Sequence, residues 1–293
     1  MMSLSELVAE ELAQPVDPKV TAMAAALAAQ YPKAARAVLF YGSCLRQREL
    51  DGLMLDFYLI VSDYRDAYES AWLVFANKAI PPNVFPFEHD GLIAKYAVLS
   101  EADFARECGI EAGSVSVWAR FAQPSRLVWA ESDAARARVI DSISHCAPTL
   151  FALTLSTMAA GQGDPLAVFR AGFALTYGAE LRAERLGRSE SIVDTDADYY
   201  ERIGRAAFAG PLPDAGGKAE VAAWRRRQFK GKALTLVRLA KATTTFAGGV
   251  DYIAWKINRH AGAGIEVKPW QRRWPILGAL TLLPRLWRRG AIR

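Results

Sequence analysis

Two runs of sequence decide the fold, Ala37-Val-Leu-Phe-Tyr-Gly-Ser43 and Leu53-Met-Leu-Asp-Phe-Tyr-Leu-Ile-Val61. Each is a continuous apolar stretch of strand length, which is typical of a strand buried on both faces. Gly42 and Ser43 end the first run, and a single carboxylate, Asp56, interrupts the second. The sequence therefore predicts two buried strands, with small polar residues at the end of one and an acid inside the other.

The segments around these two runs alternate between helical and strand-like patterns. Helices are predicted over residues 17–31, 66–79, 101–107 and 114–122, and further strands over 92–99 and 126–129. After residue 133 the pattern is helical almost throughout, with interruptions at 161–164, 187–198 and 210–217. The predicted fold class is α+β, with a mixed sheet and helices in residues 1–130 and an all-helical domain in residues 131–293.

Charge is distributed unevenly along the chain. The whole sequence has 36 basic and 31 acidic residues and a net charge of +5. Residues 224–293 contain 16 Lys and Arg but only two acids, so they carry about +14 and residues 1–223 carry about −9. A basic segment on an acidic body favours a polyanionic partner, either an anionic lipid surface or a nucleic acid. The alternative is a basic face that is merely solvated.

The cysteines and the N-terminal residues indicate in which cellular compartment the protein is expected. Cys44, Cys108 and Cys146 are widely spaced and odd in number, which favours a reducing environment. The first 14 residues are acidic and helical in pattern, unlike a secretory or mitochondrial leader. The apolar run at 275–284 is about half the length that crosses a bilayer. We therefore expect a cytoplasmic protein.

The polar residues of the two runs suit phosphate chemistry. A strand ending in Tyr41-Gly42-Ser43 lets the backbone approach a ligand at the glycine, and the serine can cap a helix whose N–H groups face phosphates. Asp56 on the neighbouring strand could hold Mg²⁺ against the same phosphates. Nucleotidyl transfer needs both parts, because the charge of a triphosphate must be neutralised while the attacking and leaving oxygens are held in line.

Each part also has a simpler interpretation. A Gly-Ser pair alone is commonly an ordinary turn, and a lone Asp can lie at a strand edge. Burying an unpaired carboxylate among apolar neighbours costs several kcal/mol, so Asp56 together with Gly42-Ser43 favours a site. Polymerase-like transferases generally place two carboxylates two residues apart, whereas Met54 and Tyr58 occupy those positions here. The candidates for a second metal ligand are Asp51, Glu88 and Asp90.

Four segments follow the order of motifs in one enzyme family. They are Tyr41-Gly42-Ser43, Leu55-Asp56-Phe57, Ile93-Ala-Lys-Tyr-Ala-Val-Leu-Ser100 and Trp118-Ala-Arg-Phe-Ala-Gln-Pro124. Over about residues 36–130 the chain resembles the mitochondrial translocator assembly and maintenance protein family, the soluble-type phosphatidate cytidylyltransferases of the nucleotidyltransferase superfamily. That family shares the single strand carboxylate. Its Asn-Pro-x-His-Tyr-Ser block is absent here.

The resemblance implies a polymerase-beta-like nucleotidyltransferase domain in residues 1–130. It implies transfer from CTP to phosphatidic acid, giving CDP-diacylglycerol and pyrophosphate with Mg²⁺ as cofactor. Asp56 would be the catalytic metal ligand and Lys95 a catalytic phosphate clamp. The nucleotide phosphates would be bound by Tyr41, Gly42, Ser43 and Arg120. The alternative for Lys95 and Arg120 is an ordinary surface position.

The C-terminal segment, about residues 268–293, has the composition of a membrane interface. Clusters of Trp and Arg bracket a short apolar stretch, which is long enough to enter the headgroup layer and too short to cross it. The residues expected at the membrane are Arg272, Arg273, Trp274, Arg285, Trp287, Arg288 and Arg289. A core-packing helix with a basic outer face is the alternative. Nucleic acid is disfavoured, because its binding would need aromatic residues interleaved along a groove.

Three functions follow from these observations. The first is a phosphatidate cytidylyltransferase that acts peripherally at the inner face of a membrane. The second is a nucleotidyltransferase with a soluble acceptor, which leaves the basic tail unexplained. The third is a non-catalytic membrane-surface protein that keeps the fold without a second carboxylate.

Overall fold

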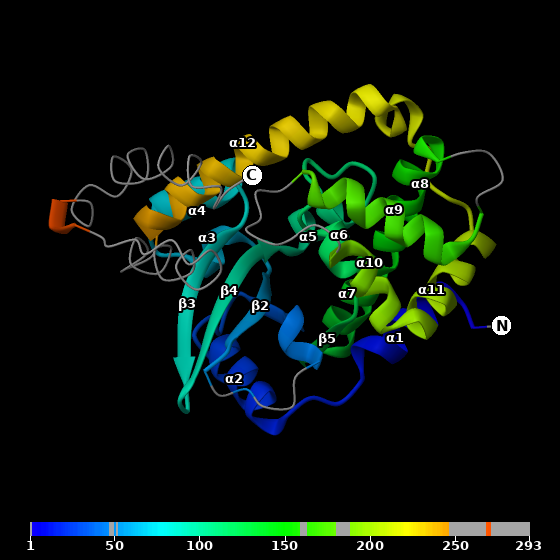
Figure 1. Ribbon diagram of the computed structural model, residues 1–293. Helices are drawn as coiled ribbons and strands as arrows, with labels where there is room; N and C mark the ends of the chain where they lie inside the picture. Colours follow the sequence, from blue (N-terminus) through cyan, green and yellow to red (C-terminus); the bar gives the residue numbers. More distant parts are fainter. Residues whose placement is uncertain are drawn as a thin grey trace.

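The computed structural model describes residues 2–46, 50, 52–158, 163–179, 188–245 and 268–270. Its centre is a five-stranded mixed sheet with the strand order β3-β4-β2-β1-β5 (Figure 1). The strands are β1 (Ala35–Tyr41), β2 (Met54–Val61), β3 (Asn83–His89), β4 (Leu92–Ser100) and β5 (Ser125–Ala130). β2 and β4 are parallel, whereas the other neighbours in the sheet are antiparallel. The predicted α+β class is thereby confirmed.

Helices account for most of the remaining described residues. In the first half they are α1 (Leu4–Leu12), α2 (Pro18–Ala29), α3 (Tyr64–Ala67), α4 (Ala71–Ala79), α5 (Glu101–Cys108) and α6 (Trp118–Phe121). In the second half they are α7 (Asp133–Ser144), α8 (Cys146–Thr154), α9 (Pro165–Tyr177), α10 (Arg188–Thr195), α11 (Ala197–Ala209) and α12 (Val221–Thr245). Short 3₁₀ turns are η1 (Ser43–Arg46), η2 (Leu155–Thr157) and η3 (Gly216–Ala219).

Local sequence explains several helix starts. Ser3 and Glu6 form a reciprocal capping box at α1, and Asp17 caps α2 directly before Pro18. Ser100 accepts from the Asp103 backbone N–H at the start of α5. These caps satisfy N–H groups that a helix leaves without an internal partner.

The two faces of the sheet are buried under different helices. On one face, Phe40 and Phe57 belong to the same buried cluster as Met23 and Leu27 of α2. The other face, which carries Tyr58, belongs to the core that also includes helices α5 to α9 and α11. Alternate residues of a strand point to opposite faces. Because both faces of the sheet are buried, β1 and β2 need apolar residues at successive positions. The burial explains why both runs lack polar alternation.

The strands over 37–41, 53–61, 92–99 and 126–129 are confirmed, but the sequence analysis omitted β3. This edge strand contains Pro86 and has exposed residues, so it lacks the pattern of a buried strand. Asp90 and Gly91 turn β3 back into β4, with φ values of 47° and 75°. An Asp-Gly pair between strands is a hairpin signal. The signal for the missing strand was therefore in the turn.

The helical predictions need three corrections. The helix over 66–79 is divided into α3 and α4, because Tyr68 has an extended backbone. The helix over 114–122 is reduced to the single turn of α6. The interruption expected at 187–198 is wrong over most of its length, because α10 and α11 occupy it.

The second half of the chain is joined closely to the sheet. Its longest helix, α12, starts beside α8 and reaches across to β3 (Figure 1). α1, from the other end of the sequence, packs against α7 and α11. A domain division at residue 130 remains a prediction. Among the described helices, none combines the length and the apolar character required to cross a bilayer.

Candidate functional site

Three predicted site residues lie in one row across the sheet. Tyr41 of β1 pairs with Asp56 of β2, and Asp56 pairs with Lys95 of β4. Their side chains share the face that carries Tyr58, because Tyr58 is two residues beyond Asp56 along β2. Residues that are 15 and 39 positions apart in sequence thus become neighbours through strand register.

Asp56 and Lys95 form an ion pair. The Lys95 Nζ to Asp56 Oδ1 distance is 2.5 Å, and the two side chains are 25% and 20% exposed, respectively. Asp56 Oδ1 is buried, and its close polar contact is with the Lys95 ammonium. The charge of the carboxylate is therefore compensated at close range.

Gly42 brings the backbone close to the same carboxylate. Its φ is +94°, a region that favours glycine, and a Cβ placed there would lie 3.2 Å from Asp56 Oδ2. Ser43 is exposed and opens η1, a single 3₁₀ turn. The capped helix expected after Ser43 is thus only a short turn. Cys44 donates from Sγ to the Met54 carbonyl over 3.5 Å, which ties this turn to the start of β2.

Arg120 of α6 lies over the aromatic residues beside this row. Its guanidinium carbon is 5.2 Å from the centre of the Tyr41 ring and 5.9 Å from that of Tyr58. Nη1 donates to the Tyr58 hydroxyl at 3.3 Å and to the Ser116 carbonyl at 2.5 Å. These contacts hold a permanent positive charge next to Tyr41, the neighbour of Asp56.

The candidates for a second metal ligand are not brought to Asp56. Glu88 shares the sheet face of Asp56, but it lies on the far side of β4, opposite Ile93 and two residues along the strand from the row of Asp56 and Lys95. Asp90 lies in the β3–β4 turn, with Oδ2 3.5 Å from His89 Nε2. Asp51 is outside the described residues. Within the described ranges no three His, Cys, Asp or Glu residues cluster as a metal site.

A single carboxylate is still compatible with Mg²⁺. This ion commonly takes one or two protein carboxylates and fills its remaining positions with water and substrate phosphates. The carboxylate of Asp56, whose Oδ1 contacts Lys95 in this structure, is the group of this row that fits such a role. Asp56 is accordingly the one described residue of this row that fits as a magnesium ligand.

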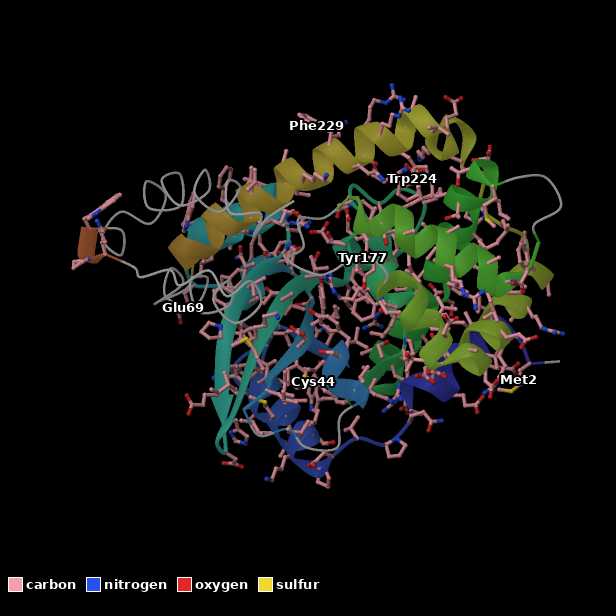
Figure 2. All side chains as sticks on the ribbon, in the orientation of Figure 1. Met2, Cys44, Glu69, Tyr177, Trp224 and Phe229 are labelled. Carbon is pink, nitrogen blue, oxygen red and sulfur yellow. The ribbon has the colours of Figure 1, made fainter. Side chains whose placement is uncertain are left out.

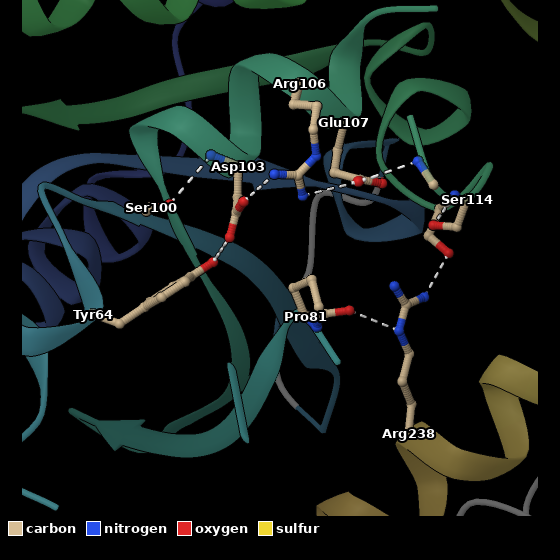
Figure 3. Close-up of polar contacts among 10 residues, drawn as sticks. Tyr64, Pro81, Ser100, Asp103, Arg106, Glu107, Ser114 and Arg238 are labelled. Atoms are coloured by element: carbon tan, nitrogen blue, oxygen red, sulfur yellow. Dashed lines mark hydrogen bonds and ion pairs between the residues drawn. The ribbon is translucent and has the colours of Figure 1, made fainter. Parts of the chain in front are cut away.

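The sequence analysis missed a junction between α12 and the segments that precede β3 and α6. Arg238 donates from Nε to the Pro81 carbonyl at 2.8 Å (Figure 3) and from Nη1 to the Ser116 hydroxyl at 2.8 Å. Lys241 donates to the carbonyls of Ile80 and Pro82. Burial, reinforced by the charge of Arg238, lowers the pKa of Lys241 to about 8. Only the basic character of α12 hinted at this junction.

A second polar network fixes the loop before α6. Tyr64 donates to Asp103, which also binds Arg106, and Arg106 contacts Glu107 (Figure 3). Glu107 in turn accepts from the Gly113 backbone N–H at 3.2 Å. Burial and the hydrogen bond to Asp103 raise the pKa of Tyr64. The tyrosine therefore stays protonated and acts as a donor that orders α5 and the loop.

Two open cavities of about 1000 Å³ lie on the helical side of the molecule. One is lined by α5, the α7–α8 junction and the end of α11, and the other by α12, η3 and residues 110–116. Neither is lined by Tyr41, Asp56 or Lys95. We assign the candidate reaction site to the strand row, because charge and metal-ligand chemistry are concentrated there.

The residues expected at the membrane lie outside the described residues. They are Arg272, Arg273, Trp274, Arg285, Trp287, Arg288 and Arg289. Comparison with known proteins gives no match to any family model and none to any curated protein.

Proposed function

We propose that this protein is a nucleotidyltransferase that transfers a cytidylyl group from CTP to phosphatidic acid at a membrane surface. The observation that carries this proposal is the row of Tyr41, Asp56 and Lys95, with Gly42 bringing the backbone against the carboxylate. It brings a candidate metal ligand, a lysine and a closely approaching glycine backbone together on one sheet face. The polymerase-beta-like arrangement and the separate helical domain are part of the same proposal.

Asp56 would hold the metal through its carboxylate, which contacts Lys95 in this structure. Mg²⁺ bound there would supply positive charge to the triphosphate and help to orient it. Gly42 has no side chain to fill the space beside Asp56 Oδ2, so phosphate oxygens would be able to approach the Mg²⁺ held by Asp56. The single acid is sufficient for this role, since the nucleotide supplies further oxygen ligands.

The two cations would take separate parts in the reaction. In the transfer, a phosphate oxygen of phosphatidic acid forms a bond to the α-phosphorus of CTP. The bond from that phosphorus to the bridging oxygen breaks, and pyrophosphate leaves with the electron pair. Lys95 would turn from Asp56 toward the phosphates, and Arg120, which lies over the Tyr41 ring, would stabilise negative charge there. No proton needs to be removed from a phosphate dianion.

The membrane part of the proposal rests on charge. α12 contains seven Lys and Arg residues and no Asp or Glu, and four of the basic residues are exposed: Arg225, Arg226, Lys230 and Lys232. An anionic leaflet attracts such a segment, with about 1 kcal/mol for each basic residue near the surface. The tail over residues 268–293 would add Trp and Arg at the headgroup layer.

One observation favours a second candidate, a non-catalytic membrane-surface protein. Lys95 already neutralises Asp56 at 2.5 Å, which is also how a purely structural ion pair would look. The two candidates differ in whether Asp56 is needed for any turnover.

Pyrophosphate release tests the proposal. Purified full-length protein is incubated with Mg²⁺, each of the four nucleoside triphosphates, and liposomes with or without phosphatidic acid. Asp56→Ala is compared with wild type, and Asp141→Ala, an exposed acid on α7, serves as the matched control. We expect release that requires both CTP and phosphatidic acid, is lost in Asp56→Ala and persists in the control. Absence of release with every combination, despite liposome binding, would favour the non-catalytic candidate.

A further inference from the structure

The cavity along α12 differs from the reaction row in its chemistry. Apolar side chains form much of its wall, and examples are Ile80 before β3, Ile110 and Val115 in the loop, and Leu234 and Val237 on α12. Its volume of about 1000 Å³ is at the upper end of small-molecule sites. The cavity therefore has room and apolar surface for a hydrocarbon chain.

Two cations at the cavity are available for a ligand. Arg226 and Lys230 line it from α12, where a spacing of four residues places them on the same helix face. Both are exposed, and neither forms a hydrogen bond or ion pair with the described part of the chain. An arginine with a lysine beside it suits a phosphate group, since the guanidinium binds oxygens in pairs.

The other two cations at this cavity are already engaged. Lys218 Nζ lies 2.6 Å from Glu111 Oε1. Arg227 stacks over the Trp224 ring at 4.6 Å and donates to the Lys218 carbonyl, and burial lowers its pKa. The contrast leaves Arg226 and Lys230 as the pair that can meet an anion.

The walls of the cavity are held in place. Glu107 binds the Gly113 backbone N–H on one wall, and Arg238 links α12 to Ser116 across the cavity's end. Ser116 also accepts from Arg120 through its carbonyl. A site that is ordered before binding loses less entropy when its ligand arrives. These contacts therefore make the cavity a preformed site instead of a loose surface groove.

We propose that this cavity binds an anionic phospholipid, with the phosphate at Arg226 and Lys230 and an acyl chain along the apolar wall. The ligand is an additional lipid, distinct from the acceptor at Asp56. The site explains why a helix with seven basic residues also exposes apolar ones, such as Phe229, which is among the lining residues and projects outward from α12 (Figure 2). It does not depend on the proposed reaction.

The test measures binding of dihexanoyl phosphatidylglycerol, below its micelle concentration, to the full chain by calorimetry. Its phosphodiester lacks the terminal phosphate oxygen needed to attack CTP, so it separates this site from the acceptor site. Inorganic phosphate and dihexanoylglycerol are measured beside it. We expect the phospholipid to bind at least about tenfold more tightly than either part alone, because charge and apolar contacts both contribute.

Matched charge reversals locate the site. Arg226→Glu with Lys230→Glu should weaken phospholipid binding at least about tenfold. Arg225→Glu with Lys232→Glu makes the same charge change at exposed positions of the same helix that do not line the cavity. This control should weaken binding by no more than about twofold. Val237→Ser should weaken binding of the phospholipid but leave that of inorganic phosphate unchanged.

Three results would overturn the proposal. They are absence of phospholipid binding to the wild type, equal loss in both double variants, and equal affinity for inorganic phosphate and the phospholipid. Circular dichroism of each variant distinguishes lost binding from lost folding, and the Val237→Ser result stands if the charge reversals unfold. Asp56→Ala should bind the probe as wild type does. Failure of pyrophosphate release would therefore leave this result intact.

Discussion

Lys95 on the sheet and Lys241 on α12 show two ways of holding a positive charge. Lys95 faces a carboxylate, Asp56, at 2.5 Å. Lys241 donates to the carbonyls of Ile80 and Pro82, with Arg238 nearby, and its pKa is lowered to about 8. The charge of the first lysine is stabilised by an opposite charge, whereas burial and the charge of Arg238 make the charged form of the second less favourable. Removing the charge of Lys95 should therefore destabilise the sheet site, whereas removing the charge of Lys241 should stabilise the α12 junction.

The largest effect is expected for Lys95→Met. Pyrophosphate release should fall about 10²- to 10³-fold, the loss typical of removing one preorganised positive or hydrogen-bonding group. The protein should also lose about 2 kcal/mol of unfolding free energy, less than for a fully buried pair because both side chains are partly exposed. Release assays and urea denaturation measure the two effects.

Asp56→Asn combined with Lys95→Met is the control for this prediction. The double variant should recover most of the lost stability, because it removes the uncompensated charge, but none of the release. A single Lys95→Met variant as stable and active as the wild type would show that the pair contributes to neither property.

The next effect is expected for Gly42→Ala, which tests the approach to Asp56. The new Cβ meets Asp56 Oδ2 at 3.2 Å, and φ of +94° is unfavourable for alanine. We expect a loss of about 2–3 kcal/mol in stability and at least about tenfold in release. Gly91→Ala is the matched control, since its φ is +75° and no atom lies within 4 Å of the added Cβ.

Gly91→Ala should cost about 1 kcal/mol and leave release unchanged. If both glycine variants lose release equally, backbone strain explains the effect and contact with Asp56 does not. Thermal unfolding and the release assay are compared for the two variants.

A smaller effect is expected for Trp224→Phe at the start of α12. The buried indole donates from Nε1 to the Leu153 carbonyl at 2.7 Å, and Trp224 points toward the helical core (Figure 2). Phenylalanine keeps an aromatic ring but leaves that carbonyl without its donor, which should cost about 1–2 kcal/mol in urea denaturation. Phe229→Leu, at a position 77% exposed on the same helix, should change stability by less than about 0.5 kcal/mol. Similar losses in both variants would contradict the assigned hydrogen bond.

The smallest effect is the pH response of Lys241. Its pKa is about 8 in the folded chain against 10.5 ordinarily, so between these values the unfolded chain binds more protons and stability rises with pH. The cost of burying the charge is fully present below pH 8. We expect about 1 kcal/mol of this cost to disappear toward pH 10.5, after solvent screening is counted.

Urea denaturation of wild type and Lys241→Met at pH 7.5 and about pH 10 measures this response, since titration elsewhere in the protein cancels in the difference. The wild type should gain stability relative to the variant at the higher pH. A constant difference would show that Lys241 has no lowered pKa.

The local features of the sheet were predictable because they depend on nearby residues. The apolar runs of β1 and β2 identified both strands, and the acid inside β2 identified Asp56 as unusual. β3 was missed because an edge strand with Pro86 lacks the pattern of a buried one. α10 and the first two residues of α11 were missed because the polar segment at 187–198 resembles a loop when read alone.

The contacts of the candidate site were less predictable because they depend on register and on distant segments. Lys95 was proposed from resemblance, but only pairing of β2 with β4 places it beside Asp56. The hydrogen bonds of Arg238 join residues 157 and 122 positions apart in sequence. No local pattern identifies such partners, because the separation is set by the packing of α12.

The sequence by itself determined the α+β class, four of the five strands in the described residues, and the glycine and aspartate of the candidate sheet site. These follow from apolar periodicity and from the cost of burying a carboxylate, which are properties of short segments. Only the tertiary structure decided the pairing of Lys95 with Asp56 and the attachment of α12 through Arg238 and Lys241. Strand register and helix docking are set by packing between distant residues, so neither can be read from one segment alone.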